Sequence, residues 1–158
     1  MTEDKARVAD LIRKAFLGVE LGDGVGLWQA QGIDDYEDAQ TIADYRARDE
    51  KVDWSAIPAA DVNRCYSSLS FFDAEGMRFH LPAYLIADLE GKFEQDVIFH
   101  LTNALDWTDT QFSLFSDSQR NAVREFLLLR LSDPDCDFER PMIEDALSRF
   151  WTVRREDR

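Results

Sequence analysis

The side chains best suited to chemistry in this sequence lie close together within residues 71–84. Asp73, Glu75, Arg78 and His80 fall within eight consecutive positions, among aromatic residues. A histidine beside carboxylates can act as a general base whose ring an acid orients, and an arginine can bind a carboxylate or phosphate. Because no Ser or Cys nucleophile stands in a tight turn nearby, the pattern predicts at most a small-ligand binder or a hydrolase-like enzyme.

The same segment also has a structural interpretation, which we favour. Asp-Ala-Glu-Gly at residues 73–76 is typical of a turn, and an ion pair from Arg78 would hold it. Paired charges perturb one another without any catalytic purpose. We therefore predict no catalytic residue and keep this segment as a candidate ligand or partner contact, through Asp73, Glu75, Arg78, His80 and Tyr84.

The strongest metal-like pattern is Asp133-x-Asp135-x-Asp137 with Glu144 eleven positions after the first aspartate. This spacing matches carboxylate positions of a calcium-binding EF-hand loop. The position that requires glycine for the sharp turn is Phe138, and an acidic linker between helices explains the carboxylates equally well. We predict no metal site and no cofactor.

Charge is the second feature of the sequence that bears on function. The net charge is −14, from 32 acidic and 18 basic residues, and residues 20–53 carry ten acidic against three basic side chains. Such a chain is repelled by phosphate backbones and anionic lipids, so we expect neither nucleic acid nor membrane as a partner. Acidic surface with aromatic anchors is suited to a basic protein, and Trp28, Asp34 and Asp35 are the candidate contacts. A merely solvated acidic face is the alternative.

Length and composition indicate one helical domain spanning residues 1–158. Hydrophobic residues make up 45% and aromatics 12% of the 158 residues, enough to build a core without metal or disulfide. The first residues resemble no signal peptide, so we expect a cytoplasmic protein in which Cys65 and Cys136 are free thiols.

Apolar periodicity predicts an all-α fold of six or seven helices, with one short hairpin near residues 71–80. A helix at 2–17 begins at a Thr2 cap, and Ser116 with Gln119 forms a capping-box pattern before another helix. Asp34 or Asp35 would cap the second full helix, and Pro82 would open the fourth. The remaining helices are expected at residues 27–31, 58–69, 95–104 and 141–151.

One run resembles a known family. Phe-Phe-Asp-Ala-Glu-Gly-Met-Arg-Phe-His-Leu-Pro-Ala-Tyr, at residues 71–84, is similar to the signature of a functionally uncharacterised bacterial family of small proteins. The resemblance implies a small, mostly helical domain and supplies no activity or ligand. The sequence thus favours an acidic, non-catalytic binding protein, similar in manner to an immunity or inhibitor protein; its oligomeric state stays open.

Overall fold

Every regular element in the part of the chain that the structure describes is helical. The structure is a computed structural model that describes residues 1–103 and 111–152, and the all-α prediction is confirmed there. Eight α-helices and three short 3-10 helices occur within these two ranges. The α-helices are α1 (Glu3–Ala15), α2 (Leu27–Asp34), α3 (Ala39–Arg48), α4 (Ala59–Arg64), α5 (Ala74–Leu89), α6 (Ile98–Thr102), α8 (Asp117–Leu131) and α9 (Arg140–Arg149).

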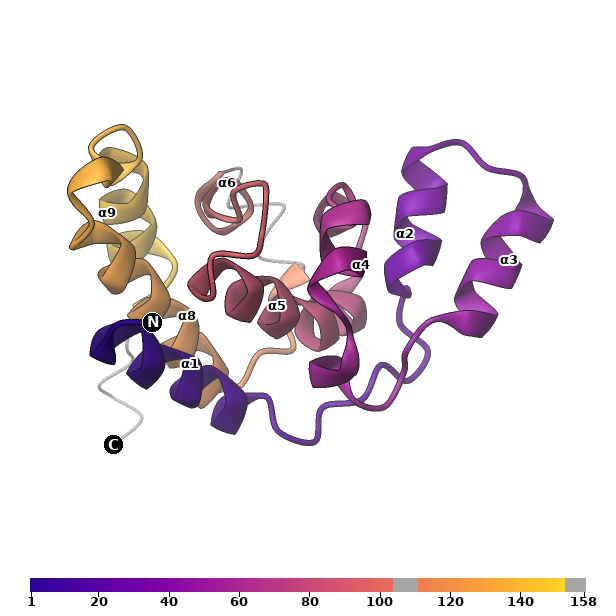
Figure 1. The fold of residues 1–158 in the computed structure, drawn as a ribbon, viewed down its shortest axis with the longest axis horizontal. Helices are drawn as coiled ribbons and strands as arrows, with labels where there is room; N and C mark the ends of the chain where they lie inside the picture. The colour runs from indigo at the N-terminus through magenta and orange to yellow at the C-terminus, as the bar shows by residue number, and fades with distance from the viewer. Residues whose placement is uncertain (104–110, 153–158) are drawn as a thin grey trace.

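Helix α5 lies at the centre of the molecule (Figure 1). Eleven of its 16 residues are buried, on every side of the helix. Helices α1 and α4 pack against it, and α8 packs along α1. A helix that is apolar all round belongs to a protein interior, and α5 has that position.

The predicted hairpin near residues 71–80 is wrong, because residues 74–80 form the first turns of α5. Pro82, predicted to open a helix, lies within it. A proline in a helix interior removes one backbone hydrogen bond and favours a kink. Burial of the surrounding apolar side chains outweighs that cost, so the helix continues to Leu89.

Local capping signals place two other helices as predicted. The Thr2 hydroxyl accepts a hydrogen bond from the Lys5 N–H at 3.2 Å and starts α1. The Ser116 hydroxyl accepts from the Gln119 N–H, and the Gln119 side chain accepts from the Ser116 N–H, so the predicted capping box starts α8.

The second full helix begins later than predicted. Asp38, rather than Asp34 or Asp35, caps α3, because its carboxylate accepts from the Thr41 N–H at 2.7 Å. Asp34 is the last residue of α2 and Asp35 its C-cap. Residues 27–31 are therefore the start of an eight-residue helix, not a short separate piece.

The buried side chains form one core, which large aromatics dominate. Trp54, in a 3-10 turn (η1, Trp54–Ala56), is buried and its indole N–H donates to the Phe16 carbonyl at 2.9 Å. Trp151 is likewise enclosed, and its indole N–H donates to the Leu101 carbonyl. These bonds tie distant parts of the chain across the interior, with Cys65 and Cys136 buried as free thiols.

Helices α2 and α3 form a helical hairpin, here called the arm, at one edge of the molecule (Figure 1). Helix α3 packs on α2, and none of its residues is buried. Within the described ranges, no helix combines the length and apolar character that a bilayer span requires. Helix α2 joins the arm to the core, since four of its eight residues are buried, whereas α3 contributes none.

Candidate functional site

Asp73 serves as a structural joint at the start of α5. One carboxylate oxygen accepts hydrogen bonds from the Gly76 N–H at 2.8 Å and from the Val25 N–H at 3.0 Å. The first bond caps the helix, and the second fixes the glycine-rich loop before α2 against it. Gly24 lies so close that an added Cβ would come within 2.9 Å of the Gly76 backbone nitrogen.

His80 is enclosed in the core, away from solvent. Its Nδ1 lies 2.7 Å from the Gly76 carbonyl oxygen, and its ring stacks on Phe72 with centroids 4.4 Å apart. Burial lowers the pKa of His80 to about 4, so the imidazole is neutral near pH 7. A ring with no exposed surface cannot reach a substrate proton in this conformation.

The other candidates of this segment do not converge on His80 around an open pocket. Tyr84 is buried and its hydroxyl donates to the Cys65 carbonyl at 2.6 Å, while burial raises the pKa of the phenol. Glu75 packs beside the glycine loop, and Arg78 makes no ion pair with the described residues. The expected Arg78 ion pair is therefore wrong, and so is the expected turn at residues 73–76, because Asp73 caps α5 and residues 74–76 belong to that helix. Tyr84 lies in the core as predicted.

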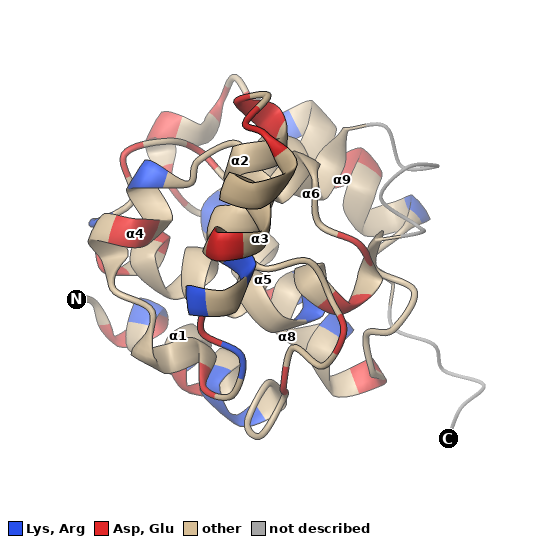
Figure 2. Ribbon diagram, turned by 90° about the vertical axis from the view of Figure 1, so that its right-hand side faces the viewer, with Lys and Arg blue, Asp and Glu red and all other residues tan. Residues whose placement is uncertain are grey.

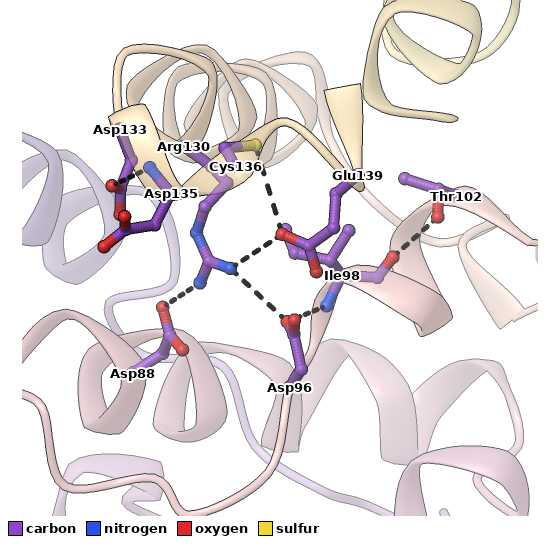
Figure 3. Close-up of polar contacts among 9 residues, drawn as sticks. All are labelled: Asp88, Asp96, Ile98, Thr102, Arg130, Asp133, Asp135, Cys136 and Glu139. Atoms are coloured by element: carbon purple, nitrogen blue, oxygen red, sulfur yellow. Dashed lines mark hydrogen bonds and ion pairs between the residues drawn. The ribbon is translucent and has the colours of Figure 1, made fainter. Parts of the chain in front are cut away.

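A charged cluster that the sequence analysis did not identify lies between α5, α8 and α9 (Figure 3). Arg130 of α8 pairs with Asp88 at 2.8 Å, Glu139 at 3.2 Å and Asp96 at 3.5 Å. The guanidinium is mostly buried, with 19% of its side chain exposed. One sequence signal existed: Arg130 follows Phe126 and Leu127 at the spacing of inward-facing residues.

Three carboxylates around one cation leave an excess of negative charge. A hydrogen bond with Asp96 and burial raise the pKa of Glu139 to about 7, while the pKa of Asp96 is lowered because the ionised form accepts that bond. The pair therefore shares one proton near neutral pH. This cluster joins three helices; the side chains of Arg130, Asp88 and Glu139 are mostly buried, whereas that of Asp96 is 47% exposed.

The arm is held by a buried carboxylate. Asp49, at the end of α3, accepts hydrogen bonds from the backbone N–H groups of Trp28 at 2.9 Å and Gln29 at 3.1 Å, at the start of α2. Burial raises the pKa of Asp49, and the two N–H donors oppose that shift. A Cβ at Gly26 would lie 2.1 Å from the Asp49 carboxylate, so only glycine fits there.

The loop between α2 and α3 carries four carboxylates and one aromatic ring at the end of the arm. We call residues 34–38, Asp-Asp-Tyr-Glu-Asp, the arm tip; the acidic residues of the arm gather there in Figure 2. Tyr36 is 95% exposed and has a positive φ of 57°, an uncommon conformation for a residue other than glycine. No Lys or Arg of the described residues pairs with the tip carboxylates.

The arm also has an aromatic pocket on its side. Trp28, Tyr45 and Arg48 line a half-open cavity of about 290 Å³. The two rings lie 6.0 Å apart, and the guanidinium of Arg64 lies over the Trp28 ring. Of the predicted partner contacts, Asp34 and Asp35 thus lie at the tip, whereas Trp28 lines this pocket and packs, partly buried, against the core.

Metal-ligand geometry is absent from the described residues, where no group of three His, Cys, Asp or Glu side chains is placed to hold an ion. In the EF-hand-like segment, Asp133 caps a 3-10 turn (η3, Pro134–Cys136) by accepting from the Asp135 N–H. Asp137 pairs instead with Arg140 at 3.8 Å. Two carboxylates of this segment, those of Asp133 and Asp137, thus serve as a cap and an ion-pair partner.

Together these features define a small helical protein with a charged interior joint and an exposed acidic arm. Residues 4–155 match the model of a family of unknown function, DUF6714, and the chain belongs to that family. No curated protein and no solved structure matches the chain. The family carries no activity that could be transferred to these residues.

Proposed function

We propose that this protein is a non-catalytic binding protein whose arm tip engages a basic protein partner. The observation that carries the proposal is Tyr36, an almost fully exposed aromatic ring flanked by four carboxylates without a cationic partner among the described residues. Exposed tyrosines are preferred anchors of protein interfaces, and uncompensated carboxylates attract and orient a basic surface.

Tyr36 closes the end of α2. It follows the C-cap Asp35 and has a positive φ; its N–H donates to the Ile33 carbonyl at 3.2 Å, and the Glu37 N–H donates to the Gly32 carbonyl at 3.0 Å. This is the Schellman arrangement that ends many helices, and it fixes the backbone that carries the ring. Nothing in the core needs this side chain, since its ring is solvated. The two ends of the loop are nonetheless fixed, because Asp38 caps α3 and Asp35 accepts from the Gln31 side chain at 3.2 Å. The ring is therefore presented on a defined backbone.

The hydrolase-like alternative has no comparable support. It requires Asp73, Glu75, Arg78 and His80 to converge around a substrate, and His80 has no exposed surface. Two of the hydrogen bonds that such chemistry would use are committed to the backbone, by Asp73 and by the His80 Nδ1. The binding function is the one that we carry forward.

Affinity capture at two ionic strengths tests the proposal. The full chain is immobilised, and proteins retained from an extract at low salt are eluted with high salt, identified, and retitrated as purified proteins. We expect a discrete basic protein whose affinity falls steeply with salt, because exposed charge pairs are screened. Tyr36→Ser and the triple variant Asp34→Asn, Asp35→Asn, Glu37→Gln should each weaken its binding about tenfold or more.

Matched controls lie at the other end of the molecule. Phe138 is 97% exposed, so Phe138→Ser removes an equally exposed ring. Asp135→Asn, Asp137→Asn, Glu144→Gln removes three carboxylate charges, as the tip variant does. Both controls should bind as the wild type does. Equal losses in tip and control variants, or no retained basic protein, would refute the proposal.

A further inference from the structure

We infer that the aromatic pocket on the side of the arm is a binding site for a small ligand made of one aromatic ring and one carboxylate or phosphate group. This site is distinct from the arm tip, and the inference does not depend on the basic partner proposed above. It rests on three observations: two aromatic walls, free guanidinium groups beside them, and a cavity of restricted size.

The aromatic walls are half-buried and held in place from below. Trp28 and Tyr45 come from α2 and α3, with ring planes at 56° to each other and centroids 6.0 Å apart. The backbone N–H of Trp28 donates a hydrogen bond to the Asp49 carboxylate at 2.9 Å, which fixes the start of α2 and therefore the residue that carries the Trp28 ring. The two rings contact each other, so a flat ligand ring would stack on the open face of one of them rather than between them.

The cations are available for a ligand. The Arg48 guanidinium lies 5.9 Å from the Tyr45 ring centroid and that of Arg64 lies 5.9 Å from the Trp28 centroid. Neither makes an ion pair with the residues that the structure describes, although acidic residues outnumber basic ones 32 to 18. Arg48 uses only its Nε, in a 3.4 Å contact with the Asp44 carbonyl, which leaves both terminal nitrogens free.

The aromatic rings and the free guanidinium groups together favour a ligand that is both flat and anionic. Arginines stacked on aromatic rings, with free N–H groups, bind planar anions through two parallel hydrogen bonds. The anion has to be attached to a flat apolar group, because the remaining walls of the pocket are aromatic. A volume of about 290 Å³ lies at the small end of ligand pockets, which limits the apolar part to about one ring system.

A titration of the isotope-labelled full chain, followed by NMR, tests this inference with four probes. Phenylacetate and phenyl phosphate carry the two anionic groups; benzyl alcohol is neutral, and phenethylamine is cationic. The Trp28 indole N–H signal is assigned with Trp28→Phe. We expect saturable shifts of that signal with at least one of the two anions. Benzyl alcohol should bind about tenfold more weakly than that anion, and phenethylamine should cause no shift.

Two arginine variants locate the anion. Arg48 is exposed and lines the cavity, so Arg48→Gln should fold normally and weaken the anion about tenfold. Arg64→Gln should have a smaller effect, since Arg64 lies on the Trp28 ring without lining the cavity. Arg149→Gln, an exposed arginine far along the chain on α9, is the control.

The outcomes are distinct. Preference for phenylacetate or for phenyl phosphate identifies which anionic group the site takes. Absence of saturable shifts with either anion, equal shifts with the neutral probe, or shifts that survive Arg48→Gln would overturn the inference. None of these results bears on the arm tip, because Tyr36 and its carboxylates are unchanged in every variant used.

Discussion

Two acidic segments, residues 34–38 and 133–139, lie at opposite ends of the molecule and look alike in sequence (Figure 1). Each has four carboxylates and one almost fully exposed aromatic side chain, Tyr36 or Phe138. In the second segment Asp137 pairs with Arg140 and Glu139 with Arg130. In the first, the described residues offer no cation. Acidity and an exposed ring are therefore common to both segments; within the described residues no carboxylate of the arm tip has a cationic partner, whereas two of the four carboxylates of residues 133–139 have one.

The comparison also separates stability from recognition. The Arg130 cluster, which includes Glu139, joins α5, α8 and α9 in a largely desolvated setting. Charges there act on one another strongly, because few waters screen them. At the arm tip the same residue types are solvated, so, apart from the Asp38 cap of α3, their effect on folding is small and their long-range field is available to a partner.

The largest expected effect is the loss of Arg130. Arg130→Met leaves Asp88 and Glu139 without their cation in a mostly buried site, and removing one member of such a cluster costs about 3 kcal/mol or more in the free energy of unfolding. Urea denaturation measures it. The control is Arg149→Met, which removes the ion pair between Arg149 and Asp145. Because the Arg149 side chain is 73% exposed, this loss should cost less than about 1 kcal/mol. A similar cost for both variants would break the comparison.

The contribution of Glu139 to the free energy of unfolding should depend on pH. Because the pKa of Glu139 rises from 4.5 to about 7 on folding, the folded state holds a proton that the unfolded state releases, and stability falls as pH increases across this window. Asp88, Asp96, Arg130 and Cys136 are the groups that face it. Gln cannot ionise and can still donate to Asp96. Glu139→Gln should therefore match the wild type near pH 4.5 and exceed its stability by about 2 kcal/mol at pH 8.

Denaturation series at several pH values provide the measurement. Glu144→Gln removes an exposed carboxylate from the same helix and controls for net charge. His80 acts with the opposite sign, since its pKa is lowered to about 4 and its contribution to stability is lost as pH falls from 6.5 towards 4. The readout is thus the difference between wild type and Glu139→Gln, in which His80 cancels. A difference that does not change with pH would contradict the shared proton.

Asp49 is the corresponding support of the arm. Asp49→Ala removes the acceptor of two N–H groups at the start of α2 and should cost about 1–2 kcal/mol. Amide hydrogen exchange should rise in α2 and α3 and stay unchanged in α8. Asp49→Asn keeps one acceptor oxygen, so its stability should lie between those of the wild type and Asp49→Ala. Exchange that rises equally in α8 would show that the arm is not a separate unit of stability.

The smallest expected effect is at the tip. Tyr36→Gly relieves the left-handed conformation, so we expect unchanged stability or a gain of up to about 1 kcal/mol. Phe138→Gly has no such conformation to relieve and should show no gain. Thermal denaturation distinguishes the two. A loss of stability in Tyr36→Gly would mean that the ring supports the fold.

The sequence predicted those parts of the fold that local signals determine. Thr2 and the Ser116–Gln119 box mark helix starts because a cap satisfies backbone N–H groups within three residues. Helix α5 was misread as a hairpin followed by a helix because it is apolar on all sides, which removes the periodic pattern, and because Pro82 mimics a helix start. Asp38 was missed as a cap because three other acidic residues stand just before it.

The candidate site was predicted only in part. Asp34 and Asp35 were selected from their charge density, and they lie beside Tyr36 at the tip. The Arg130 cluster was out of reach, because Arg130 and Asp88 are 42 positions apart and meet only in the folded chain, where α5 and α8 both pack on α1. His80 was misjudged because Asp73 and Glu75 lie a few positions before it in the sequence, whereas its ring contacts Phe72 and Phe79.

Site-specific photo-crosslinking tests the central claim most directly. A photoreactive phenylalanine analogue replaces Tyr36 in one sample and Phe138 in another, two positions of matched exposure, and crosslinks are formed in intact cells that express the full chain. We predict one discrete adduct with a basic protein from position 36 and none from position 138. The same adducts from both positions, or no discrete adduct from position 36, would contradict a recognition role for the arm tip.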